Sequence, residues 1–353
     1  MPIHTLNATQ ALLRLADFDC VIDARSEDEY ALDHLFGALN WPTLHNAERA
    51  HIGTLYKQVS AFEARKHGAV VAARNIAAHI EREIIGKPKH WRALLYCWRG
   101  GQRSGALATV LGAIGFQITL IEGGYKAWRA ALLADLPAQA ARLRYRVLCG
   151  PTGSGKTRLL QALAAQGAQV LDLEALACHR SSVLGHVPGR PQPSQKAFDS
   201  HIWHALRHFD PARPVFLESE SKKVGNLHLP DALVEAMRAS PCTDLQLATA
   251  ERVELLLQDY DYFVQDPAFF CRRLHALTQA CGKSVVEHWI ELVQRGQTAA
   301  VVEQLLRRHY DPLYAQSMAR HFSRFAQTRD CVVLHDRSAA SLQAAARRLL
   351  EQA

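Results

Sequence analysis

The 353-residue chain lacks the features that mark membrane, secreted and disordered proteins. No apolar run approaches the ~18 residues of a membrane-spanning helix. The first residues show no basic region followed by an apolar core, which a secretory leader would have. Only 14 prolines and a hydrophobic fraction of 48% exclude disordered and collagen-like compositions. We therefore expect a globular, cytoplasmic protein with no membrane partner.

Paired cysteines and metal-ligand clusters are also missing. The eight cysteines show no CxxC pair and no regular spacing, which disfavours a disulfide framework and a zinc ribbon. His201, His204 and His208 share one face of a predicted helix, but no fourth ligand is apparent. We therefore expect a polar helix face there, and no metal site.

Acidic residues are the minority among the charged ones, 34 against 41 basic residues, so the net charge is +7. No tail or block carries the excess. If a polyanion such as nucleic acid binds, we expect it to bind a folded basic surface.

The length predicts two domains at ~150 residues each. In the first 130 residues, predicted strands at 20–23, 93–96 and 117–121 alternate with helical patterns such as 69–85. This alternation indicates a parallel sheet with helical crossovers. The alanine-rich stretch 131–144, with Pro137 at its centre, is expected to be a helix and a linker.

A second α/β pattern follows the linker. It begins with a strand at 145–149 and a helix at 157–166. Further strands are predicted at 169–171, 215–217, 244–247 and 331–334, before a closing helix at 338–351. The predicted fold is therefore α/β, with one domain over 1–135 and a second over 136–353 that carries a helical insertion at about 250–326.

A glycine-rich segment in the second half matches the pattern G-x-x-x-x-G-K-[ST] at every fixed position. It stands between a predicted strand and a predicted helix, the context that a phosphate-binding loop requires. Lys156 would meet the outer phosphate, and the Thr157 hydroxyl can bind Mg²⁺. The predicted phosphate-binding residues are Gly150, Pro151, Thr152, Gly153, Ser154, Gly155, Lys156 and Thr157.

Carboxylates that could complete a magnesium site follow two other predicted strands. Asp172 and Glu174 come after 169–171, and Glu218 and Glu220 come after 215–217. Magnesium binding would explain them, and so would strand-end solvation or helix capping. Both interpretations stay open.

Cys97 lies in a second special loop, between a predicted strand and an apolar helix at 105–111. Backbone N–H groups at a helix N-terminus and two neighbouring arginines favour the thiolate, which is the reactive form of cysteine. We therefore predict Cys97 as the catalytic nucleophile. The surrounding anion cradle is predicted to be Trp98, Arg99, Gly100, Gly101, Gln102 and Arg103.

Several segments between about residues 12 and 130 resemble the successive signatures of a rhodanese domain. They are DARSEDEY from Asp23, HLFGALNWP from His34, the Cys97 loop, Gly115-Phe116 and EGGYKAW from Glu122. The cysteine loop departs from the commonest sulfurtransferase pattern, because five residues rather than four separate Cys97 from Arg103. The wider loop suits a tetrahedral, phosphate-like donor.

The combination of YCWRGGQRS with GPTGSGKT, LDLEALACHR, QPSQKAF and HYDPLY resembles the tRNA 2-selenouridine synthase family over nearly the whole chain. The resemblance implies an α/β fold with an N-terminal rhodanese-like domain and a C-terminal P-loop NTPase-like domain. It also implies a transferase that replaces the sulfur of wobble 2-thiouridine in tRNA with selenium from selenophosphate.

The resemblance further implies that the sulfur is first geranylated from geranyl diphosphate. The phosphate loop would hold the diphosphate, and Cys97 would carry selenium as a perselenide. Selenophosphate and geranyl diphosphate would be co-substrates, Mg²⁺ is a candidate ion, and no tightly bound cofactor is expected. The expected partners are tRNA carrying wobble 2-thiouridine and an enzyme that supplies selenophosphate.

Basic residues that could contact tRNA fall into two groups. One group is expected near the cysteine loop: Lys87, Lys89 and Arg92, with Arg99 of the loop itself. The other is on the C-terminal helices: Arg272, Arg273, Arg307 and Arg308.

Two other functions fit the same loops. One is an ATP-dependent tRNA sulfurtransferase, in which a nucleotide activates the uridine and Cys97 carries a persulfide. The other is a P-loop kinase or switch regulated by a redox-sensing rhodanese module.

Overall fold

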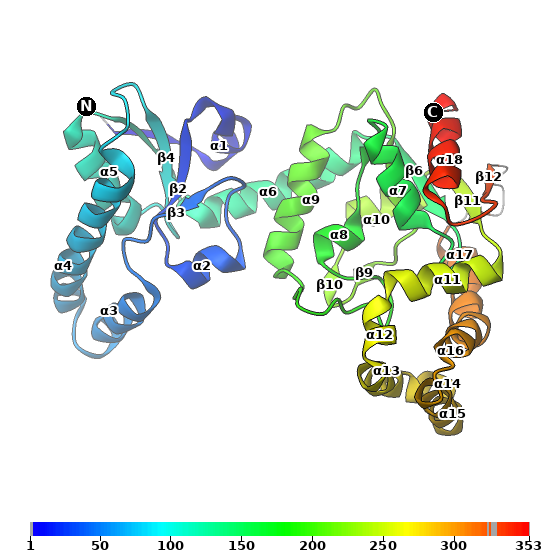
Figure 1. Cartoon of the computed structure of the whole chain (residues 1–353). Coiled ribbons are helices and arrows are strands. Elements are labelled where there is room, and N and C mark those ends of the chain that lie inside the picture. The colour runs from blue at the N-terminus through cyan, green and yellow to red at the C-terminus, as the bar shows by residue number, and fades with distance from the viewer. Residues whose placement is uncertain (1–2, 323–324, 326–329, 353) are drawn as a thin grey trace. The chain divides into compact units, whose positions relative to one another are not determined.

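The computed structural model of the chain describes residues 3–322, 325 and 330–352. It contains two compact units (Figure 1). The first comprises Met1–Leu136 and the short segment Asp199–Trp203, and the second comprises Pro137–Phe198 and His204–Ala353. Within the described residues, no helix is both long and apolar enough to span a bilayer.

The first unit is built on a parallel five-stranded sheet in the order β1-β5-β4-β2-β3. The strands are β1 (His4–Leu6), β2 (Cys20–Asp23), β3 (Leu39–Asn40), β4 (Arg92–Tyr96) and β5 (Gln117–Ile121). The three strands predicted from the sequence, β2, β4 and β5, are confirmed. The other two are very short edge strands with no alternating pattern.

Six α-helices of the first unit flank or connect these strands. They are α1 (Ala8–Leu13), α2 (Glu27–Leu32), α3 (Asn46–Gln58), α4 (Ala61–His79), α5 (Gln102–Ile114) and α6 (Gly124–Ala141). The helix predicted at 69–85 begins earlier, because the Ser60 hydroxyl caps α4 by accepting the N–H of Glu63. The helix predicted within 131–144 is confirmed, because α6 continues through Pro137 to Ala141. Only the residues between Ala141 and β6, which begins at Tyr145, are left as the connection.

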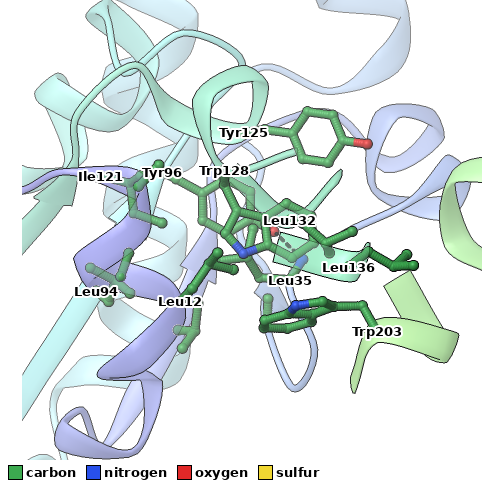
Figure 2. Close-up of a cluster of buried hydrophobic side chains, with 14 residues drawn as sticks. Leu12, Leu35, Leu94, Tyr96, Ile121, Tyr125, Trp128, Leu132, Leu136 and Trp203 are labelled. Atoms are coloured by element: carbon green, nitrogen blue, oxygen red, sulfur yellow. Dashed lines mark hydrogen bonds between the residues drawn. The ribbon is translucent and has the colours of Figure 1, made fainter. Parts of the chain in front are cut away.

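Alternate residues of β4 serve two different cores. Leu94 and Tyr96 pack on one face, with Trp128 and Leu132 of α6 (Figure 2). Ala93 and Leu95 belong to the other core, together with Leu107 and Leu111 of α5. Cys97 continues this second set, so the strand's alternation places Cys97 on the α5 face.

The segment Asp199–Trp203 completes the first of these cores. Trp203 is buried in the cluster shown in Figure 2, and its indole N–H donates to Asp135 at 2.8 Å. Arg129 of α6 also forms an ion pair with Asp199 and donates to the Ser200 hydroxyl. The first unit is therefore discontinuous in sequence, an arrangement that the domain boundaries expected from the sequence did not include.

The second unit has its own parallel sheet in the order β12-β11-β6-β8-β7. The strands are β6 (Tyr145–Cys149), β7 (Gln169–Val170), β8 (Val215–Glu218), β11 (Cys242–Gln246) and β12 (Cys331–Val333). All five were predicted to within two residues at their ends. A separate antiparallel pair, β9 (Lys223–Val224) and β10 (Leu227–His228), was missed because each strand has two residues.

Four helices belong wholly to this α/β part of the chain: α7 (Lys156–Ala165), α8 (Leu173–Ala177), α10 (Asp231–Arg238) and α18 (Ala339–Glu351). A further helix, α9 (Gln195–His208), has its two ends in this unit, and its middle is the segment Asp199–Trp203 of the first unit. The predicted helical insertion is confirmed, although its predicted end, Ala326, lies outside the described residues. It contains α11 (Thr249–Asp259), α12 (Asp261–Gln265), α13 (Pro267–Leu274), α14 (Thr278–Cys281), α15 (Lys283–Gln294), α16 (Thr298–Leu305) and α17 (Asp311–His321). A separate apolar cluster that includes Phe263, Phe270 and Trp289 forms its core.

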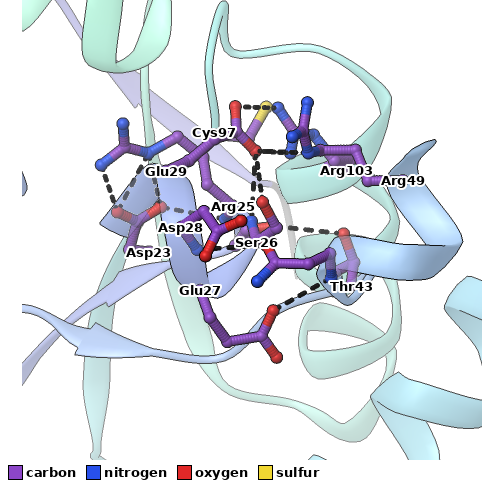
Figure 3. A network of polar contacts seen from close by, with 12 residues as sticks. Asp23, Arg25, Ser26, Glu27, Asp28, Glu29, Thr43, Arg49, Cys97 and Arg103 are labelled. Atoms are coloured by element: carbon purple, nitrogen blue, oxygen red, sulfur yellow. Dashed lines mark hydrogen bonds and ion pairs between the residues drawn. The ribbon is translucent and has the colours of Figure 1, made fainter. Parts of the chain in front are cut away.

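A buried arginine at the carboxyl end of β2 contacts three segments of the first unit. Arg25 and Asp23, 1% and 0% exposed, form an ion pair at 2.6 Å (Figure 3). Arg25 also donates to the carbonyl of Asp33 at 2.6 Å and lies 4.0 Å from the centre of the Tyr125 ring. One guanidinium thus links β2, the segment after α2 and the start of α6.

The Arg25→Met variant should lower the free energy of unfolding by about 3–5 kcal/mol, because it leaves the Asp23 carboxylate buried without its partner. Urea unfolding of the full chain measures this. Arg14→Met is the matched control, since the Arg14–Asp17 pair is about half exposed and should contribute no more than about 1 kcal/mol. Equal losses in the two variants would contradict the role given to Arg25.

Candidate functional site

Cys97 directly follows β4, and α5 begins five residues later at Gln102. Its side chain is buried, and its Sγ accepts a hydrogen bond from the Ser104 hydroxyl at 3.1 Å. The first N–H groups of a helix have no acceptors within the helix, so the start of α5 supplies free donors beside the thiol. The geometry suits a sulfur nucleophile that works on an anion.

The segment at the start of α6 holds the cysteine loop from outside. The N–H of Tyr125 donates to the carbonyl of Cys97 at 2.8 Å, and the N–H of Lys126 donates to that of Trp98 at 3.0 Å. Gly124, at φ 59°, allows this close approach, because a Cβ there would lie 2.3 Å from the Cys97 oxygen. The EGGY signature is therefore the support of the loop.

The predicted cradle residues have different surroundings. Arg103 does not stand free beside the thiol, because it pairs with Glu29 at 2.6 Å (Figure 3). Burial alone would raise the pKa of Glu29, but Arg103 and the hydrogen bonds from Ser26 together hold that pKa below its usual value. Arg99 is exposed, with Gly101 and Gln102, and Trp98 stacks on Tyr125 at 5.4 Å. The sequence alone gave no indication of the Glu29–Arg103 pair.

The predicted phosphate loop runs from the end of β6 to the start of α7. Lys156 Nζ donates to the carbonyl of Gly150 at 2.7 Å, so its ammonium lies over the loop. The Thr157 hydroxyl donates to Glu218 at 2.7 Å. The structure therefore brings together the predicted lysine, threonine and one of the four predicted carboxylates.

Three further residues hold the phosphate loop, none of them among the predicted site residues. Arg252 of α11 is buried and donates to the carbonyl of Thr152 at 2.9 and 2.7 Å. Asp311 pairs with Arg252 at 2.6 Å, and the Tyr314 hydroxyl accepts the N–H of Gly150 at 2.6 Å. Asp311 and Tyr314 both belong to the HYDPLY segment, so that segment supports the loop.

A polar cavity opens beside this loop. Its lining includes Lys156, Thr157, Arg158, Arg180 and Glu218. Two of its cations share one carboxylate, since Asp259 lies 2.7 Å from Arg158 and 3.7 Å from Arg180. The cavity thus gathers three cationic side chains around the loop, an arrangement that suits a polyphosphate.

The acidic candidates separate into two groups. Asp172 caps α8 by accepting the N–H of Ala175, so helix capping accounts for it. Glu174, Glu218 and Glu220 line the polar cavity. Burial, followed by the charge of Glu174, raises the pKa of Glu218 well above its usual value and that of Glu220 to about 7.

The raised pKa values mean that these buried carboxyl groups favour the protonated form, and a bound cation would favour the carboxylate form instead. Thr157 and Glu218 would hold Mg²⁺, with phosphate and water oxygens as the remaining ligands, because this ion is commonly bound by one or two carboxylates plus substrate phosphates. Among the described residues, no cluster of three or more His, Cys, Asp or Glu side chains could hold a metal by itself. The three histidines on one face of α9, His201, His204 and His208, do not form such a cluster either.

The basic residues predicted near the cysteine loop are elsewhere. Lys87, Lys89 and Arg92 are exposed, but Arg92 begins β4 while Cys97 follows its end. At about 3.3 Å per residue, roughly 16 Å separates Arg92 from Cys97, and the two residues lie at opposite ends of β4. Their expected place near the loop is therefore wrong.

The second basic group lies on the helical insertion. Arg307 pairs with Glu303 at 2.8 Å, and Arg272 lies 3.7 Å from Asp266. Arg273 donates to the carbonyl of Val183 at 2.9 Å, and Arg308 is exposed.

These features define the class of protein: a rhodanese-type sheet with a cysteine loop, joined to an α/β domain with a phosphate loop. The family model of the rhodanese-like domain matches residues 7–131, and that of the tRNA 2-selenouridine synthase AAA domain matches residues 143–274. The chain belongs to the tRNA 2-selenouridine synthase family.

Three relatives, each named tRNA 2-selenouridine synthase, show the extent of the similarity. The protein of Cupriavidus necator is 32% identical over 84% of this chain and 87% of its own length. That of Shewanella denitrificans is 30% identical over 89% and 92%. That of Nitrosomonas europaea is 36% identical over 68% of this chain, and the match spans 63% of that relative.

The Gly124→Ala variant should lower the free energy of unfolding by roughly 1–3 kcal/mol, because the new methyl group overlaps the Cys97 carbonyl and displaces the loop. Gly86→Ala is the control, since a Cβ there meets nothing within 4 Å. Urea unfolding and the rate of Cys97 alkylation by iodoacetamide report the two effects. If Gly124→Ala matched the wild type in both, the proposed support of the loop would be refuted.

The buried carboxylate Glu220 should make stability depend on pH when no metal is present. Its folded-state pKa of about 7 lies above the unfolded value near 4.5, so its contribution is full below pH 4.5 and is lost as the pH rises through 7. Glu220→Gln should therefore gain stability relative to the wild type between pH 5 and 8. Urea unfolding in EDTA measures this, with exposed Glu287→Gln as the control; a constant difference across this range would contradict the assignment.

Proposed function

We propose that the protein replaces the sulfur of wobble 2-thiouridine in tRNA with selenium, through an S-geranylated intermediate. The observation that carries the proposal is that one chain of this family contains two different loops at helix N-termini, each of which is suited to an anion. One has a buried cysteine beside a helix N-terminus, and the other has a lysine and a threonine beside buried carboxylates.

The phosphate loop would serve the alkylation step. The thiocarbonyl sulfur attacks C1 of geranyl diphosphate, the new S–C bond forms, and the C1–O bond breaks as diphosphate leaves. Lys156, Arg158 and Arg180 line the cavity where the leaving diphosphate would gain charge. Mg²⁺ held by Thr157 and Glu218 would supply further neutralisation of that charge.

Alkylation prepares the uridine for substitution at C2, because an S-alkyl group leaves as a thiol. The cysteine loop would serve this second step. The wide loop and the start of α5 suit the tetrahedral phosphoryl group of selenophosphate.

Selenium could reach C2 of the uridine at this loop by either of two routes. In the first, the Cys97 thiolate attacks selenium and the P–Se electron pair leaves as phosphite. The resulting perselenide displaces geranylthiol from C2, and an external thiol then reduces the S–Se bond. In the second, selenophosphate itself displaces geranylthiol, and water cleaves the Se–P bond to give phosphate. Phosphorus NMR distinguishes phosphite from phosphate.

The proposed partners follow from these steps. tRNA carrying wobble 2-thiouridine is the substrate, and an enzyme that makes selenophosphate must supply the donor. Arg99 in the cysteine loop and Arg308 on the insertion are the best placed of the predicted tRNA contacts, because both are exposed and neither forms an ion pair within the described part of the chain.

Two variants separate the two steps. By the first route, in which Cys97 carries selenium, Cys97→Ser should lose selenium incorporation at least tenfold and keep S-geranylation. Lys156→Ala should lose geranylation at least tenfold by either route. Lys156→Ala should still convert tRNA that already carries S-geranyl-2-thiouridine. Mass spectrometry of the wobble nucleoside after incubation with geranyl diphosphate or selenophosphate measures both reactions.

The competing functions give different results in the same assay. An ATP-dependent sulfurtransferase would show tRNA-stimulated ATP turnover and ignore geranyl diphosphate. Loss of both reactions in a folded Cys97→Ser variant would show that the two sites do not act separately. Exposed Cys331→Ser is the matched control and should keep both reactions.

A further inference from the structure

S-alkylation of 2-thiouridine releases a proton as well as diphosphate, and that proton needs an acceptor. In the thiouracil ring, C2 is doubly bonded to sulfur, and the neighbouring N3 carries a hydrogen. When the sulfur is alkylated, the double bond moves from C2–S to C2–N3, so the neutral product has no hydrogen on N3. A base positioned at N3 would accelerate this step. It must lie where the edge of the ring meets the phosphate loop.

A second polar cavity adjoins the polar cavity of the phosphate loop. Five residues line both, so the two cavities are adjacent: Thr157, Arg158, Glu174, Arg180 and Asp259. Beyond this shared wall, the second cavity is lined by His179 and Arg190, among others. Arg190 is exposed and forms no ion pair within the described part of the chain. Arginines at this wall suit the phosphates of a tRNA nucleotide.

Two carboxylates, Glu174 and Asp259, belong to the wall between the cavities. Asp259 is committed to cations, because one of its oxygens lies 2.7 Å from Arg158 and the other lies 3.7 Å from Arg180. Glu174 forms no ion pair among the residues that the structure describes. One of its oxygens accepts the backbone N–H of Ser181, which orients the side chain. Of the two, Glu174 is therefore the one suited to accept a proton.

The other carboxylates near the phosphate loop are less suitable. Asp172 also lines the second cavity, but its side chain caps α8. Glu218 and Glu220 line the first cavity and not the second, and Glu218 accepts the hydroxyl of the phosphate-loop threonine. Glu174 thus combines a place in both cavities with a carboxylate that neither caps a helix nor pairs with a cation.

The surroundings of Glu174 make it a stronger base than an ordinary glutamate. Burial raises the pKa of Glu174, and this effect outweighs Ser181 and Lys156, which lower it. A carboxylate with a raised pKa is better matched to proton transfer near neutral pH. The charged and titratable groups that act on Glu174 or respond to its charge are Lys156, Asp172, Glu218, Glu220 and Tyr260.

We propose that Glu174 is the general base of the S-alkylation step. It accepts the N3–H of the thiouracil ring, which enters from the second cavity, while the diphosphate lies on the phosphate loop. As the S–C1 bond forms and the C1–O electron pair leaves with diphosphate, the N3–H electron pair completes the C2–N3 double bond. The proton passes to Glu174 and then to solvent. The inference rests on the proposed function and adds a catalytic residue to it.

The pH profile of S-geranylation tests this role. Glu174→Gln should lower kcat at pH 7 at least 100-fold, the lower end of what a general base contributes. The wild-type rate should level off above the pKa of Glu174. The rate of the variant should instead rise about tenfold per pH unit between about pH 6 and 8, because it depends on ionisation of N3–H in solution.

Two further variants show that the carboxylate itself is responsible. Glu174→Asp keeps a carboxylate, so it should keep the plateau of the wild type at a reduced rate. Glu287→Gln removes an exposed carboxylate from α15 and should match the wild type at every pH.

Two measurements show that Glu174→Gln is folded and binds its substrates. Its dissociation constant for inorganic diphosphate should be no more than twofold above that of the wild type. It should also convert tRNA that already carries S-geranyl-2-thiouridine to the selenium product within twofold of the wild-type rate, because that base has no N3 proton to lose.

The possible results separate the role of Glu174 from the function. If the wild type geranylates tRNA and Glu174→Gln does so equally fast, the inference is wrong, and the departing diphosphate takes the proton instead. A slower variant that keeps the wild-type plateau would also overturn it, because that result indicates a structural effect. A wild type that forms no S-geranyl product from geranyl diphosphate would refute the proposed function and, with it, the role of Glu174.

Discussion

Both candidate sites share one constraint. A loop whose N–H groups point toward an anion cannot use them for hydrogen bonds within the loop, so hydrogen bonds from other segments must hold its shape. In the first unit, the N–H groups of Tyr125 and Lys126 bind the carbonyls of the cysteine loop. In the second, Arg252 and the Tyr314 hydroxyl bind the phosphate loop. Each support comes from a segment distant in sequence, which explains why both loops occur with further motifs downstream of them.

The parts of the fold with strong local patterns were predictable from the sequence. The central strands have apolar runs bounded by turns, and the phosphate loop has fixed positions, so β4, β6 and Lys156 were all recognisable. The supports were not, because a partner such as Glu29 or Arg252 is chosen by three-dimensional proximity. The error over Arg92 has a similar origin. Arg92 and Cys97 are close in sequence, but an extended strand between them places them at opposite ends of β4.

Charge is distributed differently at the two loops. In the cysteine loop, Glu29 neutralises the charge of Arg103. The positive potential of this loop therefore comes from its backbone N–H dipoles and from Arg99. The phosphate loop combines Lys156 with buried carboxylates that favour protonation unless a cation is near. The first arrangement suits a single tetrahedral anion, and the second suits a metal-bound diphosphate.

The discontinuity of the first unit affects how the chain is made. The cluster around Trp128 and Leu132 is complete only when Trp203 is in place, and Trp203 follows the phosphate loop in sequence. A ribosome that has released only the N-terminal sheet has therefore exposed an unfinished apolar face. The rhodanese-like unit should reach its final stability only after the first strands of its neighbour have been synthesised, which links the folding of the two units in time.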